Sequence, residues 1–196
     1  VEEGRITALG SNDAGASLVC LMAAYQEMAP RLKGRINLSL LLSAEEEVSG
    51  SKGMEAMLPM LGSPHGVIVG EPTGMQPAVA ERGLMVLDGT AVAKAGHAAR
   101  GAGINAIYRA MEDVQRIGAM EFPEASRWLP PAGAQVTMIQ AGTGHNVVPD
   151  VCRFVVDVRS NDCYDNERML AMISQGCQSE LLPRSTRLKP SILDPD

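Results

Sequence analysis

The pattern of apolar and polar residues divides the chain near residue 77. In the first part, helical segments at 16–28 and 51–61 alternate with nearly continuous apolar runs at 35–43 and 67–69. Short apolar runs of this kind are typical of strands covered on both faces of a parallel sheet. The alternation therefore predicts part of an α/β sheet domain over residues 1–77. Pro30 predicts the end of the first helix.

The second part has a different pattern, with alternating strands and two strongly amphipathic helices. The expected elements are a strand at 84–94, a helix at 104–117, strands at 136–140 and 153–159, a helix at 166–177 and a strand at 185–189. This β-α-β-β-α-β order is the split βαβ arrangement of a ferredoxin-like domain. We expect that domain at residues 78–190, followed by a return segment towards the first domain at 191–196.

Composition and charge remove several classes of function. The net charge of -6 argues against a surface for nucleic acids, because phosphate binding needs clustered Lys and Arg. No apolar run reaches the roughly 20 residues needed to span a membrane. The four cysteines form no C-x-x-C pair, so we interpret them as reduced thiols in a cytoplasmic protein.

Acidic residues stand at three places in the first part. Asp13 lies in a turn before the first helix, the run Glu45-Glu46-Glu47 follows the first apolar strand, and Glu71 follows the second. Ligands of open α/β sheets bind beyond the carboxyl ends of the strands, so these acids are expected in one crevice. A pair of divalent cations offsets their repulsion and activates water for hydrolysis. The alternative, that the acids are helix caps and solvated loop residues, stays open.

Six motifs follow one another along essentially the whole chain. They are GSNDAG from Gly10, SAEEEVS from Ser43, GEPT from Gly70, GHA from Gly96, HNVVP from His145 and DVR from Asp157. In this order they resemble a metallopeptidase family that includes acetylornithine deacetylase, succinyl-diaminopimelate desuccinylase, aminoacylase and carboxypeptidase G. The resemblance implies a zinc-peptidase-like catalytic domain with an inserted lid domain. It also implies two divalent metal ions, with zinc favoured over cobalt and manganese.

The resemblance assigns roles to the acidic residues. It implies that Asp13 bridges both metals, that Glu47 and Glu71 each bind one of them, and that Glu46 is the general acid and base. The run of three glutamates leaves Glu45-Glu46 as an alternative register. We prefer Glu46-Glu47 because two spacer residues then separate the strand from the first acid. Many family members have Lys two positions after the bridging Asp, where this chain has Gly15, so the subfamily is less well defined.

The resemblance also assigns residues in the lid. His97 matches a histidine that reaches into the active site of the partner subunit and stabilises the oxyanion. Asn146 and Arg159 match positions that contact substrate, and Arg159 is suited to a bidentate grip on a carboxylate. An ion pair between Arg159 and Asp157 is the alternative. The expected partner is a second copy of the chain, bound through the lid domain.

The activity implied is hydrolysis of N-acyl amino acids, with N-acetyl- or N-succinyl-ornithine favoured. Succinyl-diaminopimelate hydrolysis and dipeptide hydrolysis stay open. The family's first His-x-Asp motif and its last metal-binding histidine have no counterpart in the 196 residues. We therefore expect an incomplete, inactive fragment of a two-metal amide hydrolase. A non-catalytic dimerisation module is the alternative from another class.

Overall fold

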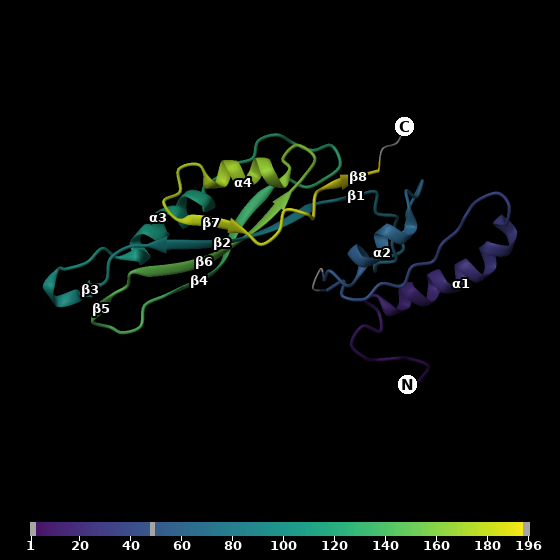
Figure 1. Cartoon of the computed structure of the whole chain (residues 1–196), viewed down its shortest axis with the longest axis horizontal. Helices are drawn as coiled ribbons and strands as arrows, with labels where there is room; N and C mark the ends of the chain where they lie inside the picture. Colours follow the sequence, from purple (N-terminus) through teal and green to yellow (C-terminus); the bar gives the residue numbers. More distant parts are fainter. Residues whose placement is uncertain (1–2, 48–49, 194–196) are drawn as a thin grey trace. The chain divides into compact units, whose positions relative to one another are not determined.

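The computed structural model describes residues 3–47 and 50–193, which form two compact units with their boundary between Pro77 and Ala78. Figure 1 shows the elements of each unit along the chain. Together the units contain α-helices and β-strands, as the sequence predicts for a mixed α/β protein. Within the described residues, no helix combines the length and the apolar character that crossing a membrane requires.

The first unit contains the helices α1 (Gly15–Leu32) and α2 (Met54–Leu61). The prediction that Pro30 ends the first helix is wrong, because Pro30 lies inside α1 and the helix continues to Leu32. A proline inside a helix removes one backbone hydrogen-bond donor. Pro30 lies only two residues before the end of α1, so little of the helix follows it.

The apolar runs of the first unit are not strands in the structure. Residues 35–43 and 67–69 carry no strand assignment, and most of their apolar side chains are exposed, Ile68 by 85% and Val67 by 72%. A strand forms only where a neighbour accepts and donates its ladder hydrogen bonds. Among the described residues these runs have no such neighbour, so the expected parallel sheet does not form.

The second unit is built on a four-stranded antiparallel sheet with the strand order β4-β6-β2-β7. Its strands are β2 (Gly83–Val92), β4 (Gly133–Ala141), β6 (Val151–Ser160) and β7 (Glu180–Pro183). Two ribbons of two strands each extend it, β1 (Ala80–Glu81) with β8 (Ser191–Ile192), and β3 (Gly96–His97) with β5 (Val147–Val148).

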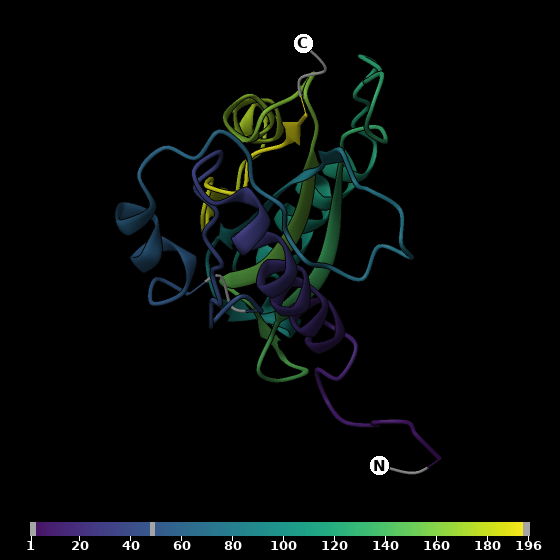
Figure 2. The ribbon, with the colours of Figure 1, turned by 90° about the vertical axis from the view of Figure 1, so that its right-hand side faces the viewer.

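Two helices cover one face of this sheet, α3 (Ala106–Gly118) and α4 (Asn166–Ser174). Figure 2 shows α4 nearly end-on beside the sheet. Asn105 caps α3 by accepting a hydrogen bond from the Ile107 N–H at 2.9 Å, and Asp165 caps α4 in the same way. The helix expected at 166–177 ends at Ser174 because Gly176 adopts a positive φ of 84°.

The core lies between the helices and the covered face of the sheet. Alternate residues of β2 and β6 point into it, as the period of a strand requires. Gly89 leaves room for the Phe154 ring, because a Cβ atom at Gly89 would lie 2.4 Å from a ring carbon. The fully buried side chains include Met85, Leu87, Phe154, Val156, Val158, Met169 and Ile173.

The last strand of the sheet is not where the sequence pattern places it. Residues 185–189 were expected as the strand, but β7 is Glu180–Pro183, so that prediction is wrong. Leu181 of β7 pairs with Gly89 and packs against the core, which fixes this segment at the sheet edge. Residues 185–189 continue past the sheet, with Leu188 in a single bridge to Leu84.

Candidate functional site

The acidic motifs of the first unit lie on exposed loops. Asp13 precedes α1 in a turn closed by a hydrogen bond from the Gly15 N–H to the Gly10 carbonyl at 2.9 Å. Glu45 adopts a positive φ of 60°, and its carboxylate accepts a hydrogen bond from the Lys52 N–H at 3.1 Å. This geometry gives Glu45 a partner within its own loop.

The structure does not bring the predicted metal ligands together. Over residues 3–47 and 50–193, no group of three or more His, Cys, Asp or Glu side chains is close enough to hold a metal ion. Asp13, Glu47 and Glu71 are all exposed, as is Glu46. Their carboxylate oxygens suit a divalent cation chemically, but the observed arrangement does not fit a two-metal centre.

The two lid motifs, in contrast, form one structure. Gly96 of β3 pairs with Val148 of β5, and His97 pairs with Val147. The backbone of the next residues continues the contact, since the Ala98 N–H donates to the Asn146 carbonyl at 3.0 Å. His97 and Asn146, far apart in sequence, are therefore neighbours on one ribbon.

The imidazole of His97 has a defined hydrogen-bonding state. Its Nδ1 accepts a hydrogen bond from the Ala99 N–H at 3.2 Å, where His97 caps the short 3₁₀ helix η1 (Ala98–Arg100). A nitrogen that accepts carries no proton, so the neutral ring has its proton on Nε2. The exposed ring thus offers an N–H donor to a ligand.

Glycine at position 96 is a steric requirement of this ribbon. A Cβ atom at Gly96 would lie 1.9 Å from the Ala102 carbonyl oxygen, and Gly103 beside it has a φ of 102°. The loop after η1 therefore closes directly over the β3 backbone. This close approach fixes the position of the neighbouring His97.

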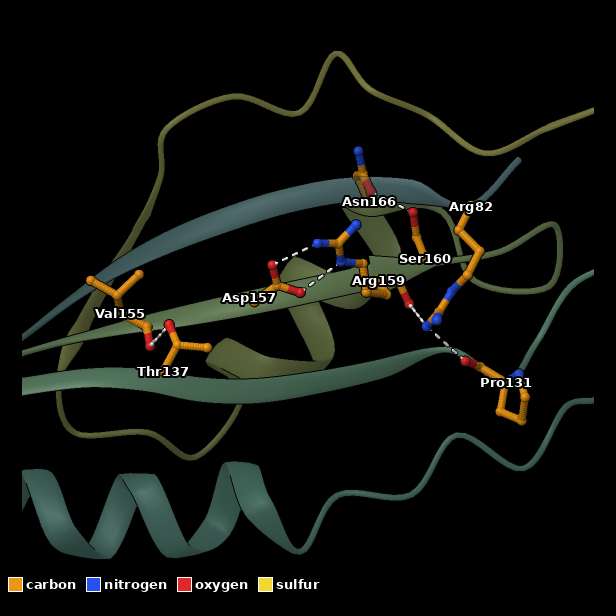
Figure 3. Close-up of polar contacts among 8 residues, drawn as sticks. All are labelled: Arg82, Pro131, Thr137, Val155, Asp157, Arg159, Ser160 and Asn166. Atoms are coloured by element: carbon orange, nitrogen blue, oxygen red, sulfur yellow. Dashed lines mark hydrogen bonds and ion pairs between the residues drawn. The ribbon is translucent and has the colours of Figure 1, made fainter. Parts of the chain in front are cut away.

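Arg159 lies on the face of the sheet that the helices leave uncovered, and it forms an ion pair with Asp157 (Figure 3). Its Nε donates to Oδ1 at 2.7 Å and its Nη2 donates to Oδ2 at 3.0 Å. Asp157 raises the pKa of Arg159, chiefly through these hydrogen bonds, while burial opposes the rise. The ion pair that the sequence left as an alternative is present.

Arg82 is a further residue of this region, and the sequence pattern gave no signal for it. Its Nη2 donates to the Pro131 carbonyl at 2.9 Å and to the Arg159 carbonyl at 3.5 Å (Figure 3). The guanidinium thereby connects the end of β6 to the loop that leads into β4. Its buried Nε has no partner among the described residues.

The β3–β5 ribbon, which carries His97, lies at the opposite end of the sheet from β1 and β8 (Figure 1). Arg159 pairs with Leu84 near the start of β2, whereas Val151 pairs with Val92 at its end, shortly before β3. At about 3.4 Å per residue, the length of β6 from 151 to 159 separates the two ends by roughly 27 Å. A small ligand cannot touch both side chains within one subunit.

A known protein family matches the sequence of the second unit. Residues 79–184 match the family of peptidase dimerisation domains termed M20, which is more than half of the 196 residues. The chain belongs to the M20 family. The matched region begins just before β1, ends just after β7, and contains His97, Asn146 and Arg159.

Relatives in this family carry names of amide hydrolases. The chain is 33% identical over 165 residues to an acetylornithine deacetylase from Myxococcus xanthus, covering 81% of this chain and 43% of the relative. It is 28% identical over 187 residues to a succinyl-diaminopimelate desuccinylase from Gluconobacter oxydans, covering 88% of this chain and 48% of the relative. The chain thus spans less than half the length of these curated relatives.

Solved structures also resemble the chain, with low overall similarity. An amidase of the hydantoinase/carbamoylase family from Burkholderia multivorans is 21% identical, with a TM-score of 0.44 over 60% of this chain and 30% of the other. A tripeptidase from Staphylococcus aureus is 16% identical, with a TM-score of 0.44 over 60% of this chain and 32% of the other.

Proposed function

We propose that this chain is part of a metal-dependent amide hydrolase that releases the acyl group from N-acyl amino acids. N-acetyl- or N-succinyl-ornithine is the favoured substrate, and succinyl-diaminopimelate is the alternative within the family. Two named relatives, an acetylornithine deacetylase and a succinyl-diaminopimelate desuccinylase, support this substrate class. The observation that carries the proposal is the β3–β5 ribbon, which makes neighbours of His97 and Asn146.

His97 is proposed to stabilise the oxyanion that forms when water attacks the amide carbonyl. The Nδ1 atom is already occupied by the Ala99 N–H, so the ring presents its Nε2–H as a donor. A donor fixed before the reaction stabilises developing negative charge without reorganisation. Asn146, next to it on the ribbon, is proposed to contact the substrate with its side-chain amide.

A two-fold dimer through the second unit is proposed to complete the site. The roughly 27 Å between the two ends of β6 prevents one N-acyl amino acid from contacting His97 and Arg159 of the same subunit. Both residues can serve one substrate if His97 comes from the partner subunit. A symmetric dimer meets this condition at two equivalent sites.

The second unit is proposed to be the lid and dimerisation domain of this hydrolase, over residues 78–190. The return segment expected at 191–196 lies partly outside the described residues, and its described part includes β8, which pairs with β1 of the same unit. Six elements support a ferredoxin-like description, namely β2, α3, β4, β6, α4 and β7 in chain order. Their strand order of β4-β6-β2-β7 places the first and third strands at the centre of the sheet.

The proposed two-metal centre belongs to the first unit. We propose Asp13, Glu47 and Glu71 as ligands and Glu46 as the general acid and base, with zinc as the favoured metal. When bound, such ions activate water and polarise the scissile carbonyl. Because the described residues do not gather these acids, we derive no reaction step from their present arrangement.

A non-catalytic dimerisation module is the second candidate. Two observations favour it: the family match lies within the second unit, and the described acids form no metal-binding group.

The four cysteines are all free thiols in the structure, which supports a cytoplasmic location for either candidate.

Hydrolysis assays with zinc separate the two candidates. The full-length protein should release ornithine from N-acetylornithine or N-succinylornithine, retain about two zinc ions per subunit after dialysis, and lose activity when a chelator removes them. A folded dimer that retains no metal and hydrolyses neither these substrates nor succinyl-diaminopimelate would instead establish the dimerisation module.

A further inference from the structure

Two arginine–carboxylate pairs lie on the uncovered face of the sheet in the second unit. Asp157 pairs with Arg159 of the same strand, and Asp88 of β2 pairs with Arg184 just after β7. Residues two apart in a strand point to the same face, which is why Asp157 reaches Arg159. The Asp157 pair lies inside the region proposed to contact substrate, whereas the Asp88 pair has no assigned role.

The geometry of the Asp157 pair leaves part of the guanidinium available. Asp157 accepts from Nε and Nη2, which form the side edge of the planar group. A guanidinium has five N–H groups, so three remain, two on Nη1 and one on Nη2. Nη1 has no hydrogen-bonding partner in residues 3–47 and 50–193. These remaining donors form the end edge, which also fits a carboxylate with two parallel hydrogen bonds.

The neighbours of Arg159 on the adjacent strands leave space beside it. Arg159 pairs with Leu84 on one side and with Gly133 on the other. A Cβ atom at Gly133 would have no heavy atom within 4 Å, so this side is open. Leu84 is half-buried and supplies an apolar neighbour on the other side. The open side at Gly133 therefore leaves room beside Arg159 for a small ligand with a carboxylate.

We propose that Asp157 is a positioning residue, which holds Arg159 by its side edge so that its end edge binds the carboxylate of an N-acyl amino acid. This inference rests on the proposed function for the identity of the ligand. Without Asp157 the long arginine side chain rotates freely, and binding a ligand must then order it. Asp157 thus lowers the entropic cost of binding while the ligand uses different N–H groups.

Side-chain NMR of the ¹⁵N-labelled 196-residue chain tests this inference without any turnover. The Arg159 Nε–Hε signal is assigned by its loss in Arg159→Lys. N-acetylglycine is the probe, and N-acetylglycinamide, which lacks the carboxylate, is the control ligand. The probe should shift the Arg159 Nη signals and leave Nε–Hε nearly unchanged, and the control ligand should shift neither.

Variants then separate positioning from general charge effects. Asp157→Asn should weaken the binding of N-acetylglycine about two- to fivefold, the range that an exposed ion pair contributes. Asp88→Asn removes the matched pair on the same face and should leave binding unchanged. In the full-length protein, Asp157→Asn should raise KM for N-acetylornithine by a similar factor with kcat unchanged.

Three results would overturn the inference. A shift of the Nε–Hε signal would mean that the probe replaces Asp157. Tighter binding of the probe by Asp157→Asn would mean that Asp157 competes with the ligand. No response of the Arg159 signals would mean that the end edge binds no carboxylate. The proposed function fails separately, if the full-length protein with zinc hydrolyses no N-acyl amino acid. The NMR result decides the role of Asp157 in either case.

Discussion

Replacing the buried Asp113 with alanine is expected to destabilise the second unit by about 2–4 kcal/mol. Asp113 lies on α3 and is 1% exposed. Its Oδ1 accepts the Gln178 N–H at 3.0 Å, and its Oδ2 accepts the Ser179 N–H at 2.8 Å. One carboxylate thus satisfies two backbone donors of the segment that connects α4 to β7.

The magnitude follows from these two hydrogen bonds. Each bond to a charged group contributes about 1.5–3 kcal/mol, so the pair contributes about 3–6 kcal/mol. Removal of the side chain also removes the cost of burying a carboxylate, which reduces the net loss to about 2–4 kcal/mol. Asp113→Asn retains one acceptor oxygen and should lie between the wild type and Asp113→Ala.

Trp128 provides a selective assay for this loss. It is the only tryptophan of the chain and belongs to the second unit, so its fluorescence in urea follows this unit alone. Glu112→Ala is the matched control, because it removes an exposed acceptor of the Gln178 side chain and should cost about 0.5 kcal/mol or less. A loss for Asp113→Ala no larger than that of this control would refute the reasoning.

The remaining predictions concern the metal site, the ribbon and the response to pH. In the full-length protein, Glu46→Gln should retain the metals and lose turnover, whereas Glu47→Gln should lose metal; the reverse result in metal analysis would shift the register by one residue. Gly96→Ala should destabilise the second unit by about 1–3 kcal/mol in the urea assay, since its Cβ overlaps a carbonyl oxygen, and an unchanged midpoint would contradict this. Arg184 lowers the pKa of Asp88, chiefly through its side-chain hydrogen bonds, so the pair stabilises fully above the ordinary value near 3.8 and less as pH falls through the lowered pKa. Asp88→Asn should therefore lose slightly less stability than the wild type on acidification, by about 0.5 kcal/mol or less, and an equal or larger loss would count against the pair.

Local sequence patterns predicted those helices and strands of the second unit whose own residues show a clear periodicity or a capping residue. The strands β2 and β6 and the helices α3 and α4 follow alternation, amphipathic spacing and capping residues that are visible in the sequence. The final strand was expected at residues 185–189, but the structure places it at 180–183. Only the packing of Leu181 beside Gly89 decides between them, and that contact joins distant parts of the chain.

The first unit shows what pattern alone does not determine. Residues 35–43 have the composition of a buried strand, yet in the structure they carry no strand assignment, and Ile36 is 60% exposed. Strand formation depends on a neighbour, and composition does not say whether one is present. The expected crevice of acids depended on that sheet, so its geometry stays a prediction.

For the candidate site, motifs identified residue types but not distances between them. The GHA and HNVVP motifs predicted His97 and Asn146 separately, and the structure adds that they share one ribbon. The sequence left the Asp157–Arg159 pair as one of two interpretations. The structure shows the pair, and the end edge of the guanidinium has no partner within the part of the chain that the structure describes. It also shows Arg159 at the end of β6 that lies away from the β3–β5 ribbon carrying His97, which no local motif indicates.

Mixing two inactive variants of the full-length protein tests the shared site most directly. His97→Ala should lower turnover with little change in metal content, and Glu46→Gln should abolish turnover. After random exchange of equal amounts, half of the dimers contain one subunit of each kind, and each of these has one site with both residues intact. The account predicts recovery of about a quarter of wild-type activity, as expected for a symmetric dimer with two shared sites. No recovery after verified subunit exchange would show that His97 does not act in the partner's site.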